Sequence, residues 1–220
     1  AALTPGEGVH IDVVVRNTGV GHRFPGGTTD AHDSWVEVEV IGAGGKVLAT
    51  SIAADRHQLR SIILGADARP RQGREVHEFL APLVDHTVAP RGSAVARFEW
   101  QLPAKVDSKS LEIRARVVHV ARNRVLVDKI CAESKTERGR AFRAGALAAG
   151  RPVGDVCIDP PRTVIAETSR KLDGSSSAEV FQRLYDHGEA LLAQVQEHVD
   201  EARGSLSKAD GLARDDRQRG

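Results

Sequence analysis

The sequence predicts a mainly β protein, an antiparallel β-sandwich followed by a long amphipathic α-helix at the C-terminus. Apolar and polar residues alternate in several short segments, which is typical of half-buried strands. Glycine- and proline-containing stretches separate these segments and supply turns. Near the C-terminus the apolar residues recur at spacings of three and four, the period of a helix. We therefore expect a sandwich over 1–170, a linker over 171–177, the helix over 178–210 and a polar tail over 211–220.

The alternating segments place the strands of this sandwich. The clearest ones occupy 8–17, 34–41, 46–52, 93–101 and 111–120. Asn123-Arg124 reads as a hairpin turn into a further strand over 125–130, and two short strands are expected within 153–168. Between them, 132–151 is expected to form a surface excursion. Seven or eight short antiparallel strands in a non-local order are typical of an immunoglobulin-like sandwich.

The C-terminal pattern predicts one long helix with a narrow apolar stripe. Its stripe consists of Val180, Leu184, Gly188, Leu191, Val195, Val199, Ala202 and Leu206. Charged residues occupy the remaining positions, and His187 is expected at a solvated or packing position on the same helix.

Composition excludes several classes of function. The 220 residues carry a net charge of +1, which gives no reason to expect nucleic acid as a partner. No apolar run reaches the roughly 18 residues of a membrane-spanning helix. The chain has no Met, so we expect a processed product or a piece of a longer protein. It contains no CxxCH, so it attaches no c-type haem itself, and no HExxH or phosphate-binding glycine loop.

The two cysteines, Cys131 and Cys157, can close one loop by a disulfide. Two buried free thiols are the alternative, and we favour the disulfide. Because no CxxC occurs, a zinc ribbon and a thioredoxin-like redox motif are both excluded.

The most informative segment is the glycine-rich connection between the first two strands, which runs from Asn17 to Asp30. Glycines flank His22 and allow a sharply shaped loop, and Phe24-Pro25 adds a rigid apolar ledge. Such a loop at the end of a sheet is a common place for functional residues. We expect the His22 imidazole to bind or ligate a group, with an axial position on haem iron or a porphyrin edge as the candidates. The alternative is a ring that hydrogen-bonds within its own loop.

Two further histidines flank a basic stretch that contains Arg69, Arg71 and Arg74. His57 and His77 could contact a haem propionate or coordinate a metal, and the alternative is that both are simply exposed. A metal-dependent enzyme built on His22, His57 and His77 is a weaker reading, because no clear constellation of carboxylates and histidines accompanies them. Trp35 and Trp100 lie on strands, where core packing is the default.

The loop resembles a pattern in large bacterial multihaem cytochrome c proteins. The resemblance rests on Asn17-Thr-Gly-Val-Gly-His22-Arg-Phe24-Pro25-Gly-Gly-Thr, followed by Asp30 and Trp35-Val-Glu-Val. In those proteins the pattern opens a β-sandwich domain that follows the haem-bearing region. Weaker matches follow at 85–92, 111–117 and 151–153, and the helix at 181–192 resembles the start of a tetratricopeptide-like extension. The family carries CxxCH sites in the same chain, and this sequence departs from it there.

The resemblance implies a non-catalytic structural or docking module of a multihaem electron-transfer assembly. A multihaem c-type cytochrome subunit would supply the haem c, and His22, Phe24 and Pro25 would contact it. The C-terminal helix would contact a neighbour in a homo- or hetero-oligomer or a filament, and the location would be periplasmic or extracellular. An extracellular ligand-binding, carbohydrate-binding or adhesion sandwich is the alternative, which the aromatic content of only 4% disfavours.

Overall fold

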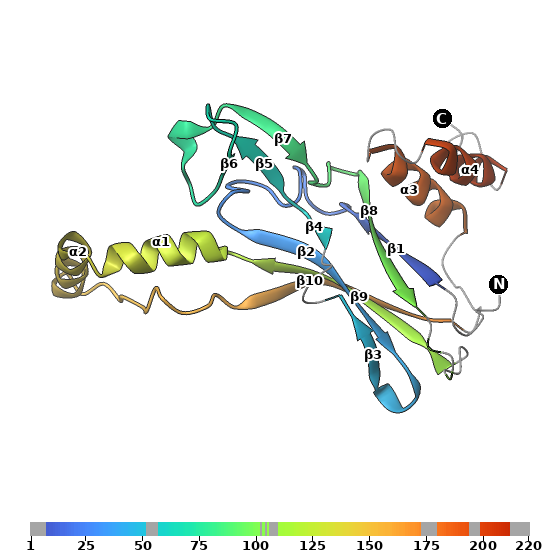
Figure 1. Cartoon of the computed structure of the whole chain (residues 1–220), viewed down its shortest axis with the longest axis horizontal. Helices are drawn as coiled ribbons and strands as arrows, with labels where there is room; N and C mark the ends of the chain where they lie inside the picture. The colour runs from blue at the N-terminus through green and yellow to red at the C-terminus, as the bar shows by residue number, and fades with distance from the viewer. Residues whose placement is uncertain are drawn as a thin grey trace.

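The computed structural model describes residues 8–51, 57–101, 103, 105, 110–172, 180–193 and 199–211. Within them the chain is mainly β, with antiparallel sheets and four α-helices (Figure 1). The strands are β1 (Gly8–Arg16), β2 (Asp33–Ile41), β3 (Val47–Thr50), β4 (His57–Gln58), β5 (Ser61–Leu64), β6 (Pro70–Arg71), β7 (Ala81–Asp85), β8 (Ser93–Gln101), β9 (Glu112–Val120) and β10 (Arg162–Lys171). The helices are α1 (Arg124–Ser134), α2 (Glu137–Ala148), α3 (Val180–Ala193) and α4 (Val199–Asp210), with short 3-10 turns at η1 (Ala43–Gly45) and η2 (Val76–Glu78).

The largest sheet has five strands. Its order is β10-β9-β2-β3, and β4 also pairs with β2. A separate two-stranded sheet joins β1 to β8 along nine residue pairs, from Gly8 opposite Gln101 to Arg16 opposite Ser93. The long connection between β3 and β8 contains a third sheet, with the order β6-β5-β7.

The core lies between the β1–β8 sheet and one face of the five-stranded sheet. Alternate residues of β2 point into it, and Val36, Val38 and Val40 are all buried. They pack with Ile11, Leu59, Val88, Ala96, Phe98, Leu111, Ala115 and Val117. The period-two pattern therefore predicts correctly which β2 side chains enter this core, although Trp35 and Glu37 on the opposite face are buried as well.

The opposite face of the five-stranded sheet carries ion pairs that run across its strands. Glu37 on β2 lies opposite Arg116 on β9, which lies opposite Glu167 on β10. Arg116 Nε donates to Glu167 Oε2 at 2.5 Å, and Arg162 Nη2 donates to Glu37 Oε2 at 2.5 Å. Glu37 is buried, and its charge is accommodated because arginines and the indole N–H of Trp35 surround its carboxylate.

Helices α1 and α2 form an arm that projects from the sheets (Figure 1). The strand predicted over 125–130 is therefore wrong, because this segment belongs to α1. Asn123, which the sequence suggested as a turn residue, is the N-cap of α1, and its side chain accepts a hydrogen bond from the backbone N–H of Leu126 at 2.9 Å. Turns and helix N-caps favour the same residue types, so this signal is ambiguous. The strand expected near 156–158 is also absent, because 151–161 return along the arm without strand pairing.

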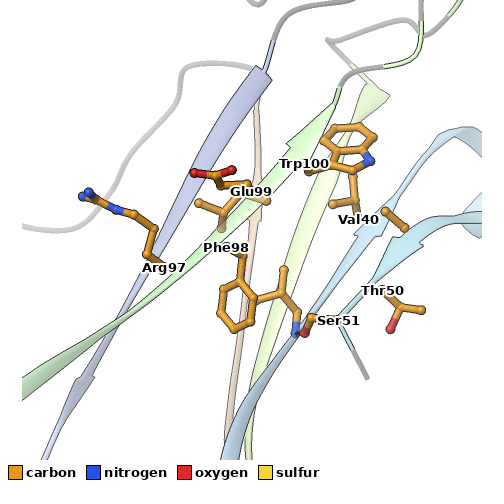
Figure 2. Close-up of a pocket in the computed structure, with 10 residues that line it drawn as sticks. Val40, Thr50, Ser51, Arg97, Phe98, Glu99 and Trp100 are labelled. Atoms are coloured by element: carbon orange, nitrogen blue, oxygen red, sulfur yellow. Dashed lines mark hydrogen bonds between the residues drawn. The ribbon is translucent and has the colours of Figure 1, made fainter. Parts of the chain in front are cut away.

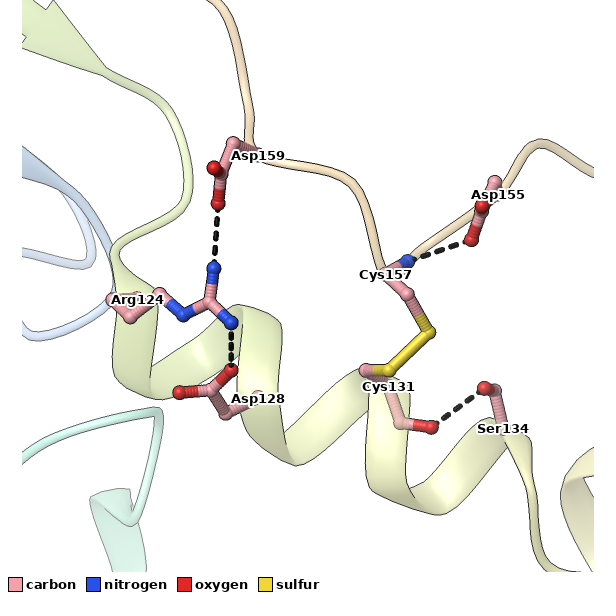
Figure 3. Close-up of a disulfide and its surroundings, with 7 residues drawn as sticks. All are labelled: Arg124, Asp128, Cys131, Ser134, Asp155, Cys157 and Asp159. Atoms are coloured by element: carbon pink, nitrogen blue, oxygen red, sulfur yellow. Dashed lines mark hydrogen bonds and ion pairs between the residues drawn. A yellow bond between two sulfur atoms is a disulfide. The ribbon is translucent and has the colours of Figure 1, made fainter.

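A disulfide between Cys131 and Cys157 ties the returning chain to α1, as predicted (Figure 3). Arg124 reinforces this link, since its guanidinium donates to Asp159 Oδ1 at 2.6 Å and pairs with Asp128 Oδ1 at 2.8 Å. The arm therefore owes its shape to a covalent link and ion pairs more than to a core of its own.

The C-terminal region is a pair of helices, so the prediction of one long helix over 178–210 is wrong. Helices α3 and α4 pack against each other, and a Cβ added to Gly188 on α3 would lie 2.6 Å from Leu206 Cγ on α4. The predicted apolar stripe is therefore divided between two helices that face each other. Residues 194–198 lie outside the described residues. Leu191 and Ala202 cover Val14 and Val95 on the outer face of the β1–β8 sheet.

The seven- or eight-stranded immunoglobulin-like sandwich is not confirmed, because the described strands divide into three sheets and one packing layer has only two strands. Most of the predicted linker (173–177) and of the polar tail (212–220) lies outside the described residues. Among the described helices, none is long and apolar enough to cross a membrane.

Candidate functional site

Asn17 organises the connection between β1 and β2. Its side-chain amide donates to the backbone carbonyl of His22 at 2.8 Å and to that of Val88 at 3.2 Å. Its side-chain oxygen accepts from the backbone N–H of Val20 at 3.0 Å. Because Asn17 is buried and its side-chain groups bind three backbone groups, the path of the loop is fixed around one residue.

His22 lies exposed on this loop, with one side of its ring held by the loop itself. Its Nδ1 lies 2.7 Å from the backbone oxygen of Arg23. A carbonyl oxygen can only accept, so we assign the proton to Nδ1, and a neutral ring then keeps a lone pair on Nε2. The sequence also allowed a ring that hydrogen-bonds within its own loop. The structure shows such a bond at Nδ1.

The absence of a side chain at Gly26 leaves the space that the His22 ring occupies. A Cβ at Gly26 would lie 2.5 Å from His22 Nδ1 and 2.9 Å from the Arg23 oxygen, closer than real Cβ contacts come. Gly19 and Gly21 have nothing within 4 Å of such a Cβ, so the glycines preceding His22 are not required by space. Gly27 has a φ of +74°, in the region that favours glycine.

Phe24 and Pro25 anchor the loop to the body. Phe24 exchanges backbone hydrogen bonds with Val88 at 2.8 and 2.7 Å, the Phe24–Pro25 peptide is cis, and Pro25 is fully buried. Pro25 is therefore a packing residue, which corrects its expected role in contacting a cofactor, while Phe24 is half-buried. Arg23 reaches Asp85, with 3.3 Å between Nη1 and Oδ2.

The carboxylate of Asp85 faces this arginine and the start of the following loop. Burial raises its pKa, but hydrogen bonds from the Thr87 hydroxyl and backbone N–H, the charge of Arg23 and a bond from Ser61 together hold the pKa below the ordinary value. Asp85 is therefore a charged partner for Arg23.

Asp30 connects the loop to the base of the arm. Its carboxylate accepts from the backbone N–H of Arg74 at 2.5 Å, and its backbone oxygen accepts from the Asn123 side chain at 2.7 Å. Asn123 in turn caps α1, and its N–H donates to the Ala31 oxygen at 2.8 Å. The His22 loop and the arm are thus joined by direct hydrogen bonds.

Behind the loop lies a histidine cluster that sequence reasoning did not assemble. His32 is buried and its Nε2 lies 3.1 Å from the Gly26 oxygen, while its ring centroid is 5.1 Å from that of His119. His119 Nδ1 lies 2.8 Å from the Ser34 hydroxyl, its partner across β2 and β9. Burial lowers the pKa of His119, nearby His32 adds to the effect, and Asp33 opposes it. Strand register would have paired Ser34 with His119, but the sequence alone does not give that register.

The other two candidate histidines lie elsewhere. His57 is half-buried on β4, and its ring stacks on that of His86 with centroids 6.0 Å apart. Burial, and secondarily the charge of His86, lower the pKa of His57 below its ordinary value. His77 is exposed on η2 beside Glu78. The described residues contain no group of three or more His, Cys, Asp or Glu side chains that could hold a metal ion, so His22, His57 and His77 do not form one metal site.

The basic stretch is largely engaged with acidic neighbours. Arg71 pairs with Asp67 at 2.8 Å and with Glu78 at 2.5 Å, and Arg69 lies 4.0 Å from Asp67. Arg74 is exposed and holds Asp30 through its backbone rather than its guanidinium.

A charged cluster joins α3 and α4 to the β1–β8 sheet. Arg97 Nε and Nη2 each donate to Asp12 at 2.7 Å, and His187 Nε2 lies 3.0 Å from Asp12 Oδ2. The other nitrogen of His187 lies 2.8 Å from the Ser205 hydroxyl. Burial raises the pKa of Asp12, but its bonds to Arg97 and His187 outweigh this effect and hold it below the ordinary value.

A cleft of about 490 Å³ opens between β8 and the β2–β3 hairpin. Phe98 and Trp100 lie on its β8 side, while Thr50 and Ser51 lie opposite (Figure 2). Trp35 is buried, but on the ion-pair face of the five-stranded sheet and not in the core between the sheets, and Trp100 is only half-buried at this cleft.

No protein-family model matches the chain, and no curated protein matches it. Among solved structures, it is similar to a penta-heme cytochrome c552 from Thermochromatium tepidum, with 16% identity and a TM-score of 0.48. The similarity covers 77% of this chain, which spans 37% of that cytochrome. A likeness at this level leaves the function to be inferred from the site itself.

Proposed function

We propose that this chain is a non-catalytic docking module of an extracytoplasmic multihaem cytochrome assembly, and that His22 supplies an axial ligand to a haem iron of its partner. The observation that carries the proposal is the 2.7 Å contact between His22 Nδ1 and the Arg23 oxygen. Ligating histidines commonly donate their second ring N–H to a backbone carbonyl, which fixes the tautomer and leaves a lone pair for the metal. The His22 side chain is exposed, so a partner can reach it.

Four further features of the chain fit this proposal. The loop sequence resembles the one in multihaem cytochrome c proteins, and the loop is fixed in place by Asn17, Asp30 and Pro25 before any partner arrives. The chain has no CxxCH, so the haem would come from the partner. The disulfide is compatible with an oxidising compartment outside the cytoplasm.

A haem c peptide with one axial histidine and an open sixth position tests this proposal directly. Titrating it with the wild-type chain should shift its absorption toward that of bis-histidine haem, because His22 Nε2 enters the open position. His22→Ala should abolish the shift, whereas His77→Ala, which removes an exposed histidine elsewhere, should keep it. Equal shifts for His22→Ala and the wild type would contradict the proposal.

The cleft at Trp100 favours a second candidate, an extracellular ligand- or carbohydrate-binding module. An aromatic side chain beside Thr50, Ser51 and Glu99 offers stacking and hydrogen bonding together. Titration with soluble oligosaccharides should then change tryptophan emission in the wild type, and Trp100→Phe should remove that change. An unchanged emission across the oligosaccharides tested would contradict this candidate.

A further inference from the structure

The arm leaves an apolar surface uncovered. None of the residues of α2 is buried, and Phe142 on α2 is 78% exposed. Between α2, the end of α1 and the returning chain lies a groove of about 780 Å³, whose apolar lining includes Ile130, Phe142, Val153 and Val156. Exposed apolar surface of this kind, rimmed by polar residues, marks an interaction site.

The groove is rimmed by positive charge. Arg138 and Arg143 line it, and residues 135–151 contain five basic side chains against one acidic side chain. Arg138 lies 4.0 Å from Glu133, but Arg143 has no hydrogen bond or ion pair within the part of the chain that the structure describes. The arm therefore fits an apolar partner surface that carries carboxylates.

The outer face of α3 has this chemistry. Tyr185 is 38% exposed and Leu192 is 49% exposed, and Glu189 lies between them in sequence. Their spacing of four and then three residues places all three on one face of the helix, a common arrangement for a helix that enters a groove. Residues 180–211 contain six acidic and three basic side chains, so this end of the chain is acidic.

The arm and the α3–α4 pair lie at opposite ends of the molecule (Figure 1). The groove of one molecule therefore cannot take up its own α3. We propose that the arm groove binds the outer face of α3 in a second copy of this chain. In that contact Tyr185 and Leu192 cover the apolar lining, and Glu189 faces the arginines at the rim.

This contact joins two different surfaces, so it is head-to-tail. Each molecule keeps one unused arm and one unused α3 face after pairing, and association continues into an open chain or a closed ring. The proposal does not rest on haem binding, because neither surface contains His22.

Sedimentation velocity of the purified, haem-free chain over a concentration series tests the proposal. At low salt the wild type should form oligomers that grow with concentration, and added salt should dissociate them because the rim contacts are ionic. Phe142→Asp and Leu192→Asp should each sediment as a monomer. Leu80→Asp, which alters an apolar side chain that is 71% exposed away from both surfaces, should associate like the wild type.

Mixing the two monomeric variants gives the decisive result. Phe142→Asp keeps an intact α3 face and Leu192→Asp keeps an intact groove, so the mixture should form a heterodimer that does not grow further. A wild type that stays monomeric into the millimolar range would overturn the proposal, as would a mixture that remains monomeric. Circular dichroism checks the folding of each variant. A charge exchange tests the contact without altering the apolar lining. Arg143→Glu alone should lose association, and adding Glu189→Arg to it should restore association.

Discussion

Gly26 shows how one small residue decides the orientation of a functional side chain. Its missing Cβ leaves the space in which the His22 ring approaches the Arg23 carbonyl. Gly26→Ala should therefore displace the ring, lower the free energy of unfolding by about 1 kcal/mol and weaken binding of the open haem c peptide. Urea unfolding and the absorption titration measure the two effects. Gly21→Ala is the matched control, and equal binding by the two variants would argue against this role of Gly26.

The stacked pair of His57 and His86 links stability to pH. The pKa of His57 in the folded protein lies below the ordinary value of 6.5, so the unfolded chain takes up a proton first as pH falls. The contribution of His57 to stability is thus complete above pH 6.5 and is lost as pH falls toward the lower, folded pKa. His119 acts in the same direction, since its pKa is also lowered.

His57→Gln should flatten the decline of stability below pH 6.5 without abolishing it, because His119 remains. Urea unfolding at several pH values on either side of 6.5 measures this. A variant whose unfolding free energy falls as steeply as that of the wild type would show that burial of His57 does not control the slope.

At the scale of single elements, the disulfide is what holds the arm. Cys131→Ser with Cys157→Ser should release the returning chain from α1, and loop closure of this length stabilises a folded chain by about 3 kcal/mol. Trypsin should then cut after Arg138, Arg140 and Arg143 faster, while the sheets remain resistant. Limited proteolysis with mass spectrometry follows both regions.

Arg124→Gln is the graded control, because it removes only the exposed ion pairs with Asp128 and Asp159. Its arm should be cut only slightly faster than that of the wild type. Equal protection of the arm with and without the two cysteines would mean that other contacts hold the arm in place.

The strands and helices also show which sequence patterns are sufficient to predict secondary structure. Strands β2, β8 and β9 are predictable because alternation reports burial on one face, and Val36, Val38 and Val40 are indeed core residues. Helix α1 is not predictable from its start, since Asn123 suits both a turn and an N-cap. The apolar stripe over 180–206 fits one long helix that packs on another segment and equally fits two shorter helices that pack on each other. The close approach of Gly188 on α3 to Leu206 on α4 shows that the second arrangement is the one adopted.

The same limit applies to the site. The sequence identified the His22 loop from its glycines, phenylalanine and proline, yet the role of Asn17 and the pairing of Ser34 with His119 depend on contacts across 71 and 85 residues. Long-range register and loop closure are set by the whole fold, and no local pattern encodes them.

For the whole molecule, the joint between the C-terminal helices and the sheets connects segments far apart in the sequence, since Asp12 and His187 lie 175 residues apart. Asp12→Ala should remove the paired bonds to Arg97 and the bond to His187, and lower the free energy of opening of α3 and α4 by about 2 kcal/mol. Hydrogen exchange should accelerate in these helices and stay unchanged in β2 and β9. Asp210→Ala, on the exposed side of α4, should leave exchange unaltered, and uniform acceleration throughout the chain would contradict a local joint.

The bonds of His187 to Asp12 and to Ser205 link three elements through one side chain. The ring belongs to α3, Asp12 lies on β1 and Ser205 lies on α4. A displacement of either helix would therefore disturb the same imidazole, and a partner that pulls on these helices would load the sheet through that ring.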